Sequence, residues 1–264
     1  MAERPFDAST FNVFPEEWLA AAPGLRVTSA LIRIEVAEGD DGIIEKARKW
    51  FVPESLAISR VIENDLVVAG DFRIDHGGHM RFAVFARPHV GNRRVGRVMQ
   101  RLCEVETYKA MSMLGLSRAR ELGPKMGEFD TRLTSLLEDM RSTTADPAIV
   151  LQSLLEVSAE IENTIAQSSF RFGATEAYEK IVNQRIGVLR EERFEGRQTF
   201  GEFMMRRFDP AMRTVKSSQG RLESMSDRAI RASQLLRTRV DVARSDQNQK
   251  LLESMDRRAD LQLR

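Results

Sequence analysis

Two histidines come closest to a metal-binding pattern. His76 and His79 flank Gly77 and Gly78, and Asp75 stands immediately before them. Two imidazoles spaced i and i+3 across a turn could share a metal ion. Paired glycines also accept the positive φ of tight hairpin turns, so the same residues suit a solvent-facing hairpin tip. Both interpretations are open, and we expect the hairpin tip, because Asp75 would be the only further ligand nearby.

Carboxylates supply a second set of candidates. Glu104 and Glu106 are two residues apart in a helical pattern, which places them about 200° apart around the helix, so they do not form an acid–base pair by themselves. We expect one of them to be buried against an arginine. The mixed-charge run 190–197 suits a salt-bridge face, with a docking patch as the alternative.

The motifs of several common enzyme classes are missing. The sequence contains no Gly-rich phosphate loop, no Gly-x-Ser-x-Gly elbow and no His-Glu-x-x-His. We therefore assign no catalytic, cofactor-binding or metal-binding residue and expect a protein that is not an enzyme. An enzyme stays open as an alternative if Glu104 or Tyr178 lies in a cleft among groups with shifted pKa values.

A divalent cation is the one cofactor kept as an alternative. Asp241, Asp246, Asp256 and Asp260 lie near the C-terminus. On a single helix they are ordinary surface acids. If copies of the helix met around an axis, they would present rings of carboxylates to Mg²⁺ or a similar hard cation.

Composition excludes several classes of protein. With 40 basic and 39 acidic residues the formal net charge is +1, so we expect no nucleic-acid partner. Cys103 is the single cysteine, which excludes an internal disulfide and fits a reducing compartment. We expect Cys103 to be a small core residue.

The first fifteen residues do not have the layout of a secretory signal, and no run of 18 apolar residues occurs.

The predicted secondary structure changes at Pro88, from strands with one short helix before it to helices after it. Before it, the patterns predict strands at 25–36 and 56–62, a short helix at 40–52, and a hairpin of 66–74 with 80–86. After it, no convincing strand pattern recurs. We expect helices at 91–123, 125–141, 148–195 and 197–208, with Gly123-Pro124 breaking the first from the second.

The last helix is the most informative part of the sequence. Asp209-Pro210 is a good N-cap and first-turn pair, and the residues from Ala211 to Arg264 contain no proline and one glycine. At 1.5 Å per residue this helix would measure roughly 80 Å. No stop signal closes it. We expect residues 211–236 to pack on the protein's own helices and the part from Val240 onward to project.

A thin apolar stripe marks the face of that helix that could meet other copies. Positions eleven residues apart fall on one nearly straight stripe, since eleven residues span three turns. The stripe predicts oligomer or stalk contacts at Leu236, Val240, Ala243, Gln247 and Leu251. The predicted fold is α+β, with a small, mostly antiparallel α/β domain (1–88), a helical body (89–208) and a very long C-terminal stalk helix (209–264).

Four long phrases carry a resemblance to a known family. They are VMQRLCEVETYK at 98–109, SFRFGATEAY at 169–178, LREERFEGRQTFGEF at 189–203 and RASQLLRTRVDVA at 231–243. They resemble a bacterial family of uncharacterised membrane-anchored proteins, a domain of unknown function, over nearly the whole chain from about residue 50. The resemblance implies that hydrophobic helices follow the segment matching 251–264, so that the stalk is truncated before its membrane segments.

Two functions follow as expectations. The first is the cytoplasmic region of a membrane-anchored protein at the inner membrane, a non-catalytic structural or interaction module that forms a homo-oligomer and reaches the membrane through segments beyond Arg264. The second comes from architecture alone: an α/β domain, helices and a very long last helix are similar to CorA-type divalent-cation channels, so the chain would be the regulatory domain of a metal-ion transporter.

Overall fold

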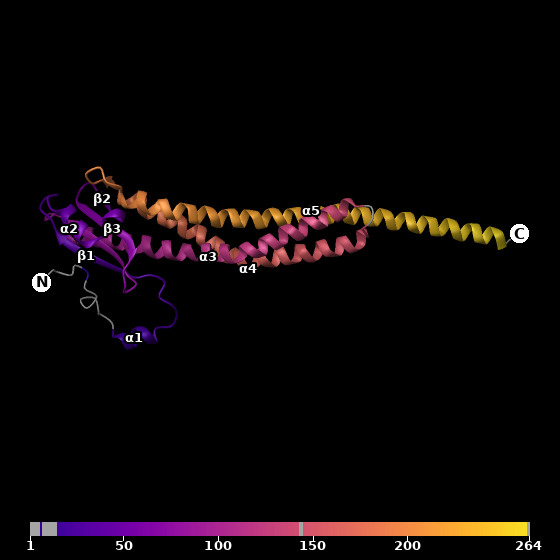
Figure 1. Ribbon diagram of the computed structural model, residues 1–264, viewed down its shortest axis with the longest axis horizontal. Helices are drawn as coiled ribbons and strands as arrows, with labels where there is room; N and C mark the ends of the chain where they lie inside the picture. The colour runs from indigo at the N-terminus through magenta and orange to yellow at the C-terminus, as the bar shows by residue number, and fades with distance from the viewer. Residues whose placement is uncertain (1–5, 7–14, 143–144, 263–264) are drawn as a thin grey trace. The chain divides into compact units, whose positions relative to one another are not determined.

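The computed structural model describes residue 6, residues 15–142 and residues 145–262. Figure 1 shows a sheet-bearing region and the long helices α3, α4 and α5. The elements in chain order are α1 (Glu16–Ala21), β1 (Ala30–Val36), α2 (Ile43–Trp50), the 3₁₀ turn η2 (Pro53–Ser55), β2 (Ala57–Val61), β3 (Leu66–Ile74), β4 (Met80–Ala86), α3 (Asn92–Arg141), α4 (Pro147–Leu189), β5 (Glu192–Arg193) and α5 (Phe200–Gln262).

The strands form one five-stranded sheet in the order β1-β4-β3-β2-β5. Strand β1 pairs with β4 in parallel, and the other three pairings are antiparallel. The predicted α+β fold, with its mostly antiparallel sheet, long helices and long C-terminal helix, is therefore confirmed. The expectation of no strand after Pro88 is wrong, because β5 pairs with β2 through Ser59–Arg193 and Arg60–Glu192. Two residues are too few to show a period in sequence.

The chain divides into two compact units. Unit 1 consists of Met1–Leu116 and Gly173–Arg213, and unit 2 consists of Ser117–Phe172 and Thr214–Arg264. Each unit thus combines stretches that are distant in the sequence, and every long helix contributes a segment to both.

One face of the sheet in unit 1 is covered by α2. Its Ile43 and Ala47 are buried in a cluster with Phe51 and with sheet residues including Val67 and Phe85. The Trp50 ring stacks on that of Phe85, with 5.7 Å between centroids and 9° between planes. Burial of such side chains contributes about 1.5–3 kcal/mol each, which is what fixes this short helix on the sheet.

Strand β3 carries a bulge at Phe72. Its pairing with β4 shifts register between Gly70 and Ile74, and Phe72 has a φ of 53°. Asp71, fully buried, supports the bulge: its carboxylate accepts hydrogen bonds from the backbone N–H of Arg73 at 3.1 Å and from the Arg81 guanidinium at 3.0 Å. A bulge redirects a side chain, and here the ring of Phe72 lies 4.6 Å from that of Phe200.

The long helices do not end where the sequence suggested. Helix α3 runs through Gly123 and Pro124, and α5 begins at Phe200, so Pro210 lies inside it. The predicted helix break at Pro124 and the predicted helix start at Asp209-Pro210 are both wrong. An interior proline costs about 3 kcal/mol. Packing offsets this cost, since Leu122 and Met126 are buried on either side of Pro124.

Unit 2 has a core built on a repeating spacing. Its buried side chains are three and four residues apart on each helix, which is the spacing that packs neighbouring helices side by side. They are Ala119, Leu122, Met126, Phe129 and Leu133 of α3, Val150, Leu154, Val157 and Ile161 of α4, and Leu222, Met225, Ala229, Ala232 and Leu236 of α5.

Cys103 is exposed on α3, so the expectation of a core cysteine is wrong. The buried face of this stretch of the helix passes through Val98, Leu102 and Val105. Residue 103 follows Leu102 by one position and so lies about 100° away from it around the helix.

Candidate functional site

The predicted contact residues lie on the last part of α5. Leu236 is 1% exposed and belongs to the core of unit 2. Val240 is half-buried, and Ala243, Gln247 and Leu251 are exposed. Burial of α5 in its own unit therefore stops between Leu236 and Val240, where the sequence predicted the change. A role for the predicted residues in contacts between copies stays a prediction.

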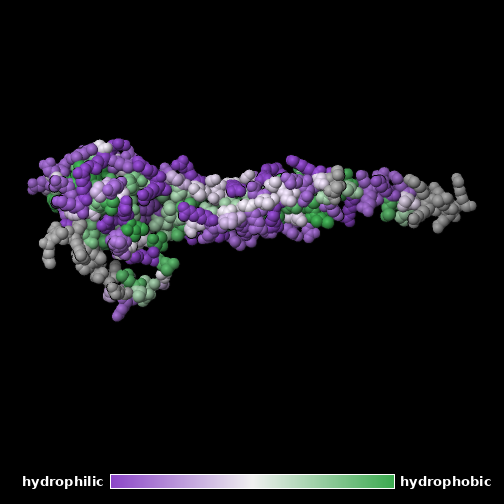
Figure 2. Space-filling view, viewed as in Figure 1, coloured by the Kyte–Doolittle hydropathy of each residue, from purple (hydrophilic) through white to green (hydrophobic). Residues whose placement is uncertain are grey.

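Beyond that point lies the terminal segment of α5, defined here as Asp241–Met255. Every side chain in it is exposed. The apolar side chains are among them, with exposed fractions of 57% for Val242, 61% for Leu251, 63% for Leu252 and 60% for Met255. In Figure 1 the segment belongs to the yellow end of α5, and in Figure 2 hydrophobic atoms occur there among hydrophilic ones.

Contacts of α5 with the rest of unit 2 come before this segment. The guanidinium of Arg228 lies 3.0 Å from the Asp130 carboxylate. The Arg239 guanidinium donates a hydrogen bond to the backbone carbonyl oxygen of Met140 at 2.6 Å, close to the end of α3. Both contacts fix the helix just before its exposed stretch.

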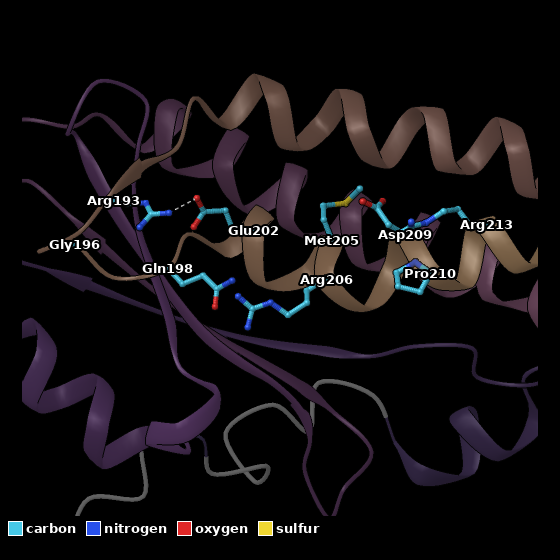
Figure 3. Close-up of a pocket in the computed structure, with 9 residues that line it drawn as sticks. All are labelled: Arg193, Gly196, Gln198, Glu202, Met205, Arg206, Asp209, Pro210 and Arg213. Atoms are coloured by element: carbon cyan, nitrogen blue, oxygen red, sulfur yellow. Dashed lines mark hydrogen bonds and ion pairs between the residues drawn. The ribbon is translucent and has the colours of Figure 1, made fainter.

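A polar groove of about 790 Å³ lies beside the first turns of α5, in unit 1. Figure 3 shows its side chains, with Arg193 joined to Glu202 and Arg206 directed toward Gln198. The Arg193–Glu202 ion pair measures 2.7 Å. The pKa of Glu202 is lowered, and the hydrogen bond from the Arg193 side chain is the largest cause. The hydrogen bond from the backbone N–H of Thr199 is the next largest. Mixed charges of this kind offer ion pairs to a partner, and the docking-patch interpretation of 190–197 stays a prediction.

The glutamates of α3 are held in ion pairs. Glu104 lies 2.5 Å from the Nε atom of Arg185, as expected for one of the two, but its side chain is half-buried and not buried. Glu106 is the more deeply buried, at 6% exposure, and pairs with Lys109 instead. Tyr178 stacks on Tyr108, with 5.6 Å between the ring centroids. All three side chains belong to unit 1, and the enzyme alternative based on Glu104 or Tyr178 stays a prediction.

A half-buried carboxylate, that of Glu191, was missed in the sequence. Glu191 accepts hydrogen bonds from the Ser59 hydroxyl at 2.7 Å and from the backbone N–H of Gly201 at 2.8 Å. Burial raises the pKa of Glu191 despite these bonds. Its position within the charged run 190–197 concealed it, because that run suited an exposed face.

The histidines form the hairpin tip that the sequence favoured. The Asp75 carboxylate accepts bonds from the backbone N–H groups of Gly77 and His79, both at 2.9 Å, and the His79 ring lies 2.7 Å from the Ser29 hydroxyl. Among the residues that the structure describes, no group of three or more His, Cys, Asp or Glu side chains could hold a metal ion. The side chains of Asp256 and Asp260 lie outside the described part.

None of the helices in the described part of the chain combines the length and the apolar character needed to cross a bilayer.

Comparison with known proteins places the chain in a family. The family model described as "Protein of unknown function (DUF3422)" matches residues 1–264. Searches of curated proteins and of solved structures found no match. Because the family model covers the whole of this sequence, the chain belongs to the DUF3422 family of proteins of unknown function.

Proposed function

We propose that this chain is a non-catalytic interaction module of a membrane-anchored protein and that it forms a homo-oligomer through the terminal segment of α5. The observation that carries the proposal is the complete exposure of Asp241–Met255 directly after a helix segment whose core side chains are buried as far as Leu236.

An unsupported helix of this length is marginal in water. Isolated helices shorter than about 12–15 residues scarcely form, and most helical stability in proteins comes from packing of an apolar face. Of the exposed apolar side chains, Leu251 and Met255 are four residues apart on one side of the helix, and they supply apolar surface that is exposed in unit 2. Packing against the same segment of other copies would stabilise it.

The predicted face gives that packing a geometry. Val240, Ala243, Gln247 and Leu251 follow one another by three and four residues, so they lie along one side of the helix. Small and polar residues alternate with apolar ones on it, and a polar residue within a seam sets register and the number of chains at some cost in stability. The face thus supports a specific assembly and differs from a uniformly apolar surface that would associate without specificity.

Crosslinking tests this assembly. In a Cys103→Ser background, Ala243→Cys places a thiol on the proposed face, and Ser245→Cys places one about 200° away on the same exposed stretch. We expect oxidation to join the Ala243→Cys copies covalently while the Ser245→Cys copies stay single. Light scattering should give a mass that is a multiple of the 30.0 kDa chain. A strict monomer at all concentrations, or equal crosslinking of both variants, would rule the assembly out.

Location is part of the same proposal. We place the protein at the cytoplasmic face of the inner membrane, as the family resemblance implies. Fractionation of cells that express the natural protein should recover it with inner membranes, in a form released by detergent and retained in high salt. Recovery in the soluble fraction would contradict the anchoring while leaving the assembly to be judged by crosslinking.

The exposed carboxylates favour a second candidate. Asp241 and Asp246 lie on the terminal segment, and an assembly about an axis would bring copies of each together, as a CorA-like metal-ion transporter requires. Flux of Mg²⁺ or Co²⁺ into liposomes holding the natural protein tests it. Flux that falls with Asp246→Asn would support transport, and a folded protein without flux would exclude it.

A further inference from the structure

Unit 1 contains a second cleft, and its lining is mostly apolar. It measures about 590 Å³ and lies between the hairpin of β3 and β4, α3, the start of α5 and the segment 25–29. The side chains that matter to its chemistry are Phe72, Met113, Leu114 and Phe203, with Lys109 and Arg207. Figure 2 shows hydrophobic atoms gathered on the sheet-bearing unit. Sites for small molecules have volumes of about 300–1,000 Å³ and combine such a lining with a few polar groups.

The wall of the cleft is held in a strained conformation. Phe72 has a φ of 53°, in a region that costs a non-glycine residue about 1–3 kcal/mol. Its ring stacks on Phe203 with 4.9 Å between centroids and 15° between planes. The buried Asp71 carboxylate, bonded to Arg73 and Arg81, maintains the bulge. Strain of this kind persists where the surroundings enforce it, and it concentrates at ligand sites.

The polar groups of the cleft have an excess of positive charge. Glu106 is buried and accepts bonds from the Thr28 hydroxyl at 3.2 Å and from the Lys109 ammonium. An ammonium has three donors, of which this bond uses one. Arg26 and Arg207 also line the cleft. Three cations against one carboxylate favour an anionic group at the end of an apolar ligand.

The position of Arg207 suits that head group. Its guanidinium lies 5.8 Å from the centre of the Phe203 ring, and the side chain is exposed. A guanidinium presents paired donors that match the two oxygens of a carboxylate. The apolar body of the ligand would then lie along Phe72, Met113 and Leu114, with its charged end near Arg207 or Lys109.

We propose that this cleft binds a single-chain anionic amphiphile, with a long-chain alkyl carboxylate as the representative ligand. The apolar lining takes the alkyl chain, and the cationic groups take the head group. This site is separate from the terminal segment of α5, and its test does not depend on oligomerisation or on membrane attachment.

Calorimetric titration with three twelve-carbon probes tests the proposal, each kept below its solubility limit and, for the two ionic probes, below its micelle-forming concentration. Dodecanoate is anionic, dodecanol neutral and dodecyltrimethylammonium cationic. We expect saturable binding of dodecanoate at one molecule per chain, about tenfold tighter than dodecanol, with the cation weaker still. Equal affinity for all three probes would show general hydrophobic adsorption and overturn the proposal.

Matched variants locate the site. Met113 and Val188 are exposed to 37% and 38%, and only Met113 lines the cleft. Met113→Glu should weaken dodecanoate binding about tenfold or more by placing a like charge and a polar group among apolar side chains, whereas Val188→Glu should leave it unchanged. A circular dichroism melt shows that both variants fold. Equal losses in the two would contradict the assignment.

A neighbouring pair of arginines tests the head group. Arg207 lines the apolar cleft and Arg206 lines the polar groove of Figure 3. Arg207→Gln should weaken dodecanoate about three- to tenfold and leave dodecanol unchanged, and Arg206→Gln should change neither. Loss of affinity for both probes in Arg207→Gln would mean that the arginine shapes the cleft without binding the head group.

Vesicle flotation distinguishes a soluble amphiphile from one that belongs to a bilayer. The protein is floated with vesicles of zwitterionic lipid that either lack dodecanoate or contain it as a tenth of the lipid. Binding to free dodecanoate without flotation indicates a soluble amphiphile. Flotation that requires dodecanoate and is lost in Met113→Glu indicates one drawn from a bilayer, and flotation unaffected by Met113→Glu would exclude the cleft as the membrane-borne site.

Discussion

Thr199 and Glu202 cap the longest helix reciprocally. The backbone N–H of Glu202 donates to the Thr199 hydroxyl at 3.1 Å, and the backbone N–H of Thr199 donates to the Glu202 carboxylate at 3.2 Å. This is a capping box, which satisfies two N–H groups that a helix start otherwise leaves unpaired. It explains why α5 begins at Phe200, nine residues before the cap that Asp209 was predicted to form.

Removal of the cap should therefore destabilise unit 1. We expect Thr199→Ala to lower the free energy of unfolding by about 1 kcal/mol, as loss of an N-cap hydroxyl does. Thr238→Ala is the matched control, because the hydroxyl of that exposed threonine donates to the Gln234 carbonyl oxygen within the same helix. The control should be neutral or slightly stabilising, since alanine is the better helix former. Urea unfolding followed by circular dichroism measures both, and equal losses would show that the box does not hold the helix start.

Glu191 should make stability depend on pH in an unusual direction. Burial raises its pKa above the ordinary value of 4.5. Above that value the folded protein binds more protons than the unfolded chain, so the free energy of unfolding falls as pH rises through the folded pKa. The contribution is complete below the unfolded pKa and lost above the folded one. Glu191→Gln cannot titrate, and its stability relative to the natural protein should therefore grow as pH increases.

Glu202 supplies the opposite sign for comparison. Arg193 is the main cause of its lowered pKa, so its contribution is present above the ordinary carboxyl pKa and is lost as pH falls through the folded value. Urea unfolding of Glu191→Gln and Glu202→Gln from about pH 2 to about pH 8 should show Glu202→Gln diverging from the natural protein mainly below the ordinary carboxyl pKa and Glu191→Gln above it, in opposite senses. Parallel curves for the Glu191→Gln variant and the natural protein would mean that Glu191 does not titrate in this range.

Two glycines of α3 have opposite tolerances for a methyl group. A Cβ atom at Gly115 would lie 2.1 Å from the Thr175 hydroxyl oxygen of α4, whereas one at Gly127 would meet nothing within 4 Å. Gly115→Ala should destabilise the protein by about 1–3 kcal/mol, because the helices must separate. Gly127→Ala should stabilise it by about 0.5–1 kcal/mol, because alanine loses less backbone entropy in a helix. Thermal unfolding of both variants gives the comparison, and a neutral Gly115→Ala would contradict the close approach.

The sequence was a good guide where a feature depends on local pattern. The hairpin of β3 and β4 was readable because Gly77-Gly78 separates two apolar runs. The end of burial along α5 was readable because apolar residues thin out after Leu236. Both features follow from residues close together in the chain.

Features that depend on packing between distant residues were not readable. Pro124 normally ends a helix, and α3 continues because Met126 and Phe129 are buried beyond it. The bulge at Phe72 depends on Asp71 meeting Arg81 of the neighbouring strand. One wall of the apolar cleft is the Phe72 ring, which contacts Phe203 at the start of α5. The capping box at Thr199 has a sequence signature, but the stronger Asp-Pro signal at 209 and 210 concealed it.

Leucines on the two sides of the boundary in α5 should separate folding from assembly. Leu236 is 1% exposed and Leu251 is 61% exposed. Leu236→Ala should lower the free energy of unfolding by about 2–5 kcal/mol, since it removes buried methyl groups and leaves a cavity. Leu251→Ala should change the stability of the monomer by less than about 0.5 kcal/mol and should weaken self-association, because its side chain lies on the proposed contact face.

The two effects have to be measured apart, since association stabilises the folded state by mass action and makes the midpoint depend on concentration. Urea unfolding at a concentration where both variants are monomeric gives the folding effect, and light scattering over a concentration series gives the association constant. If Leu251→Ala associates like the natural protein, that part of α5 does not form the contact. If it destabilises the monomer as strongly as Leu236→Ala, the terminal segment packs within its own chain, because a side chain exposed in the monomer has little free energy to lose there.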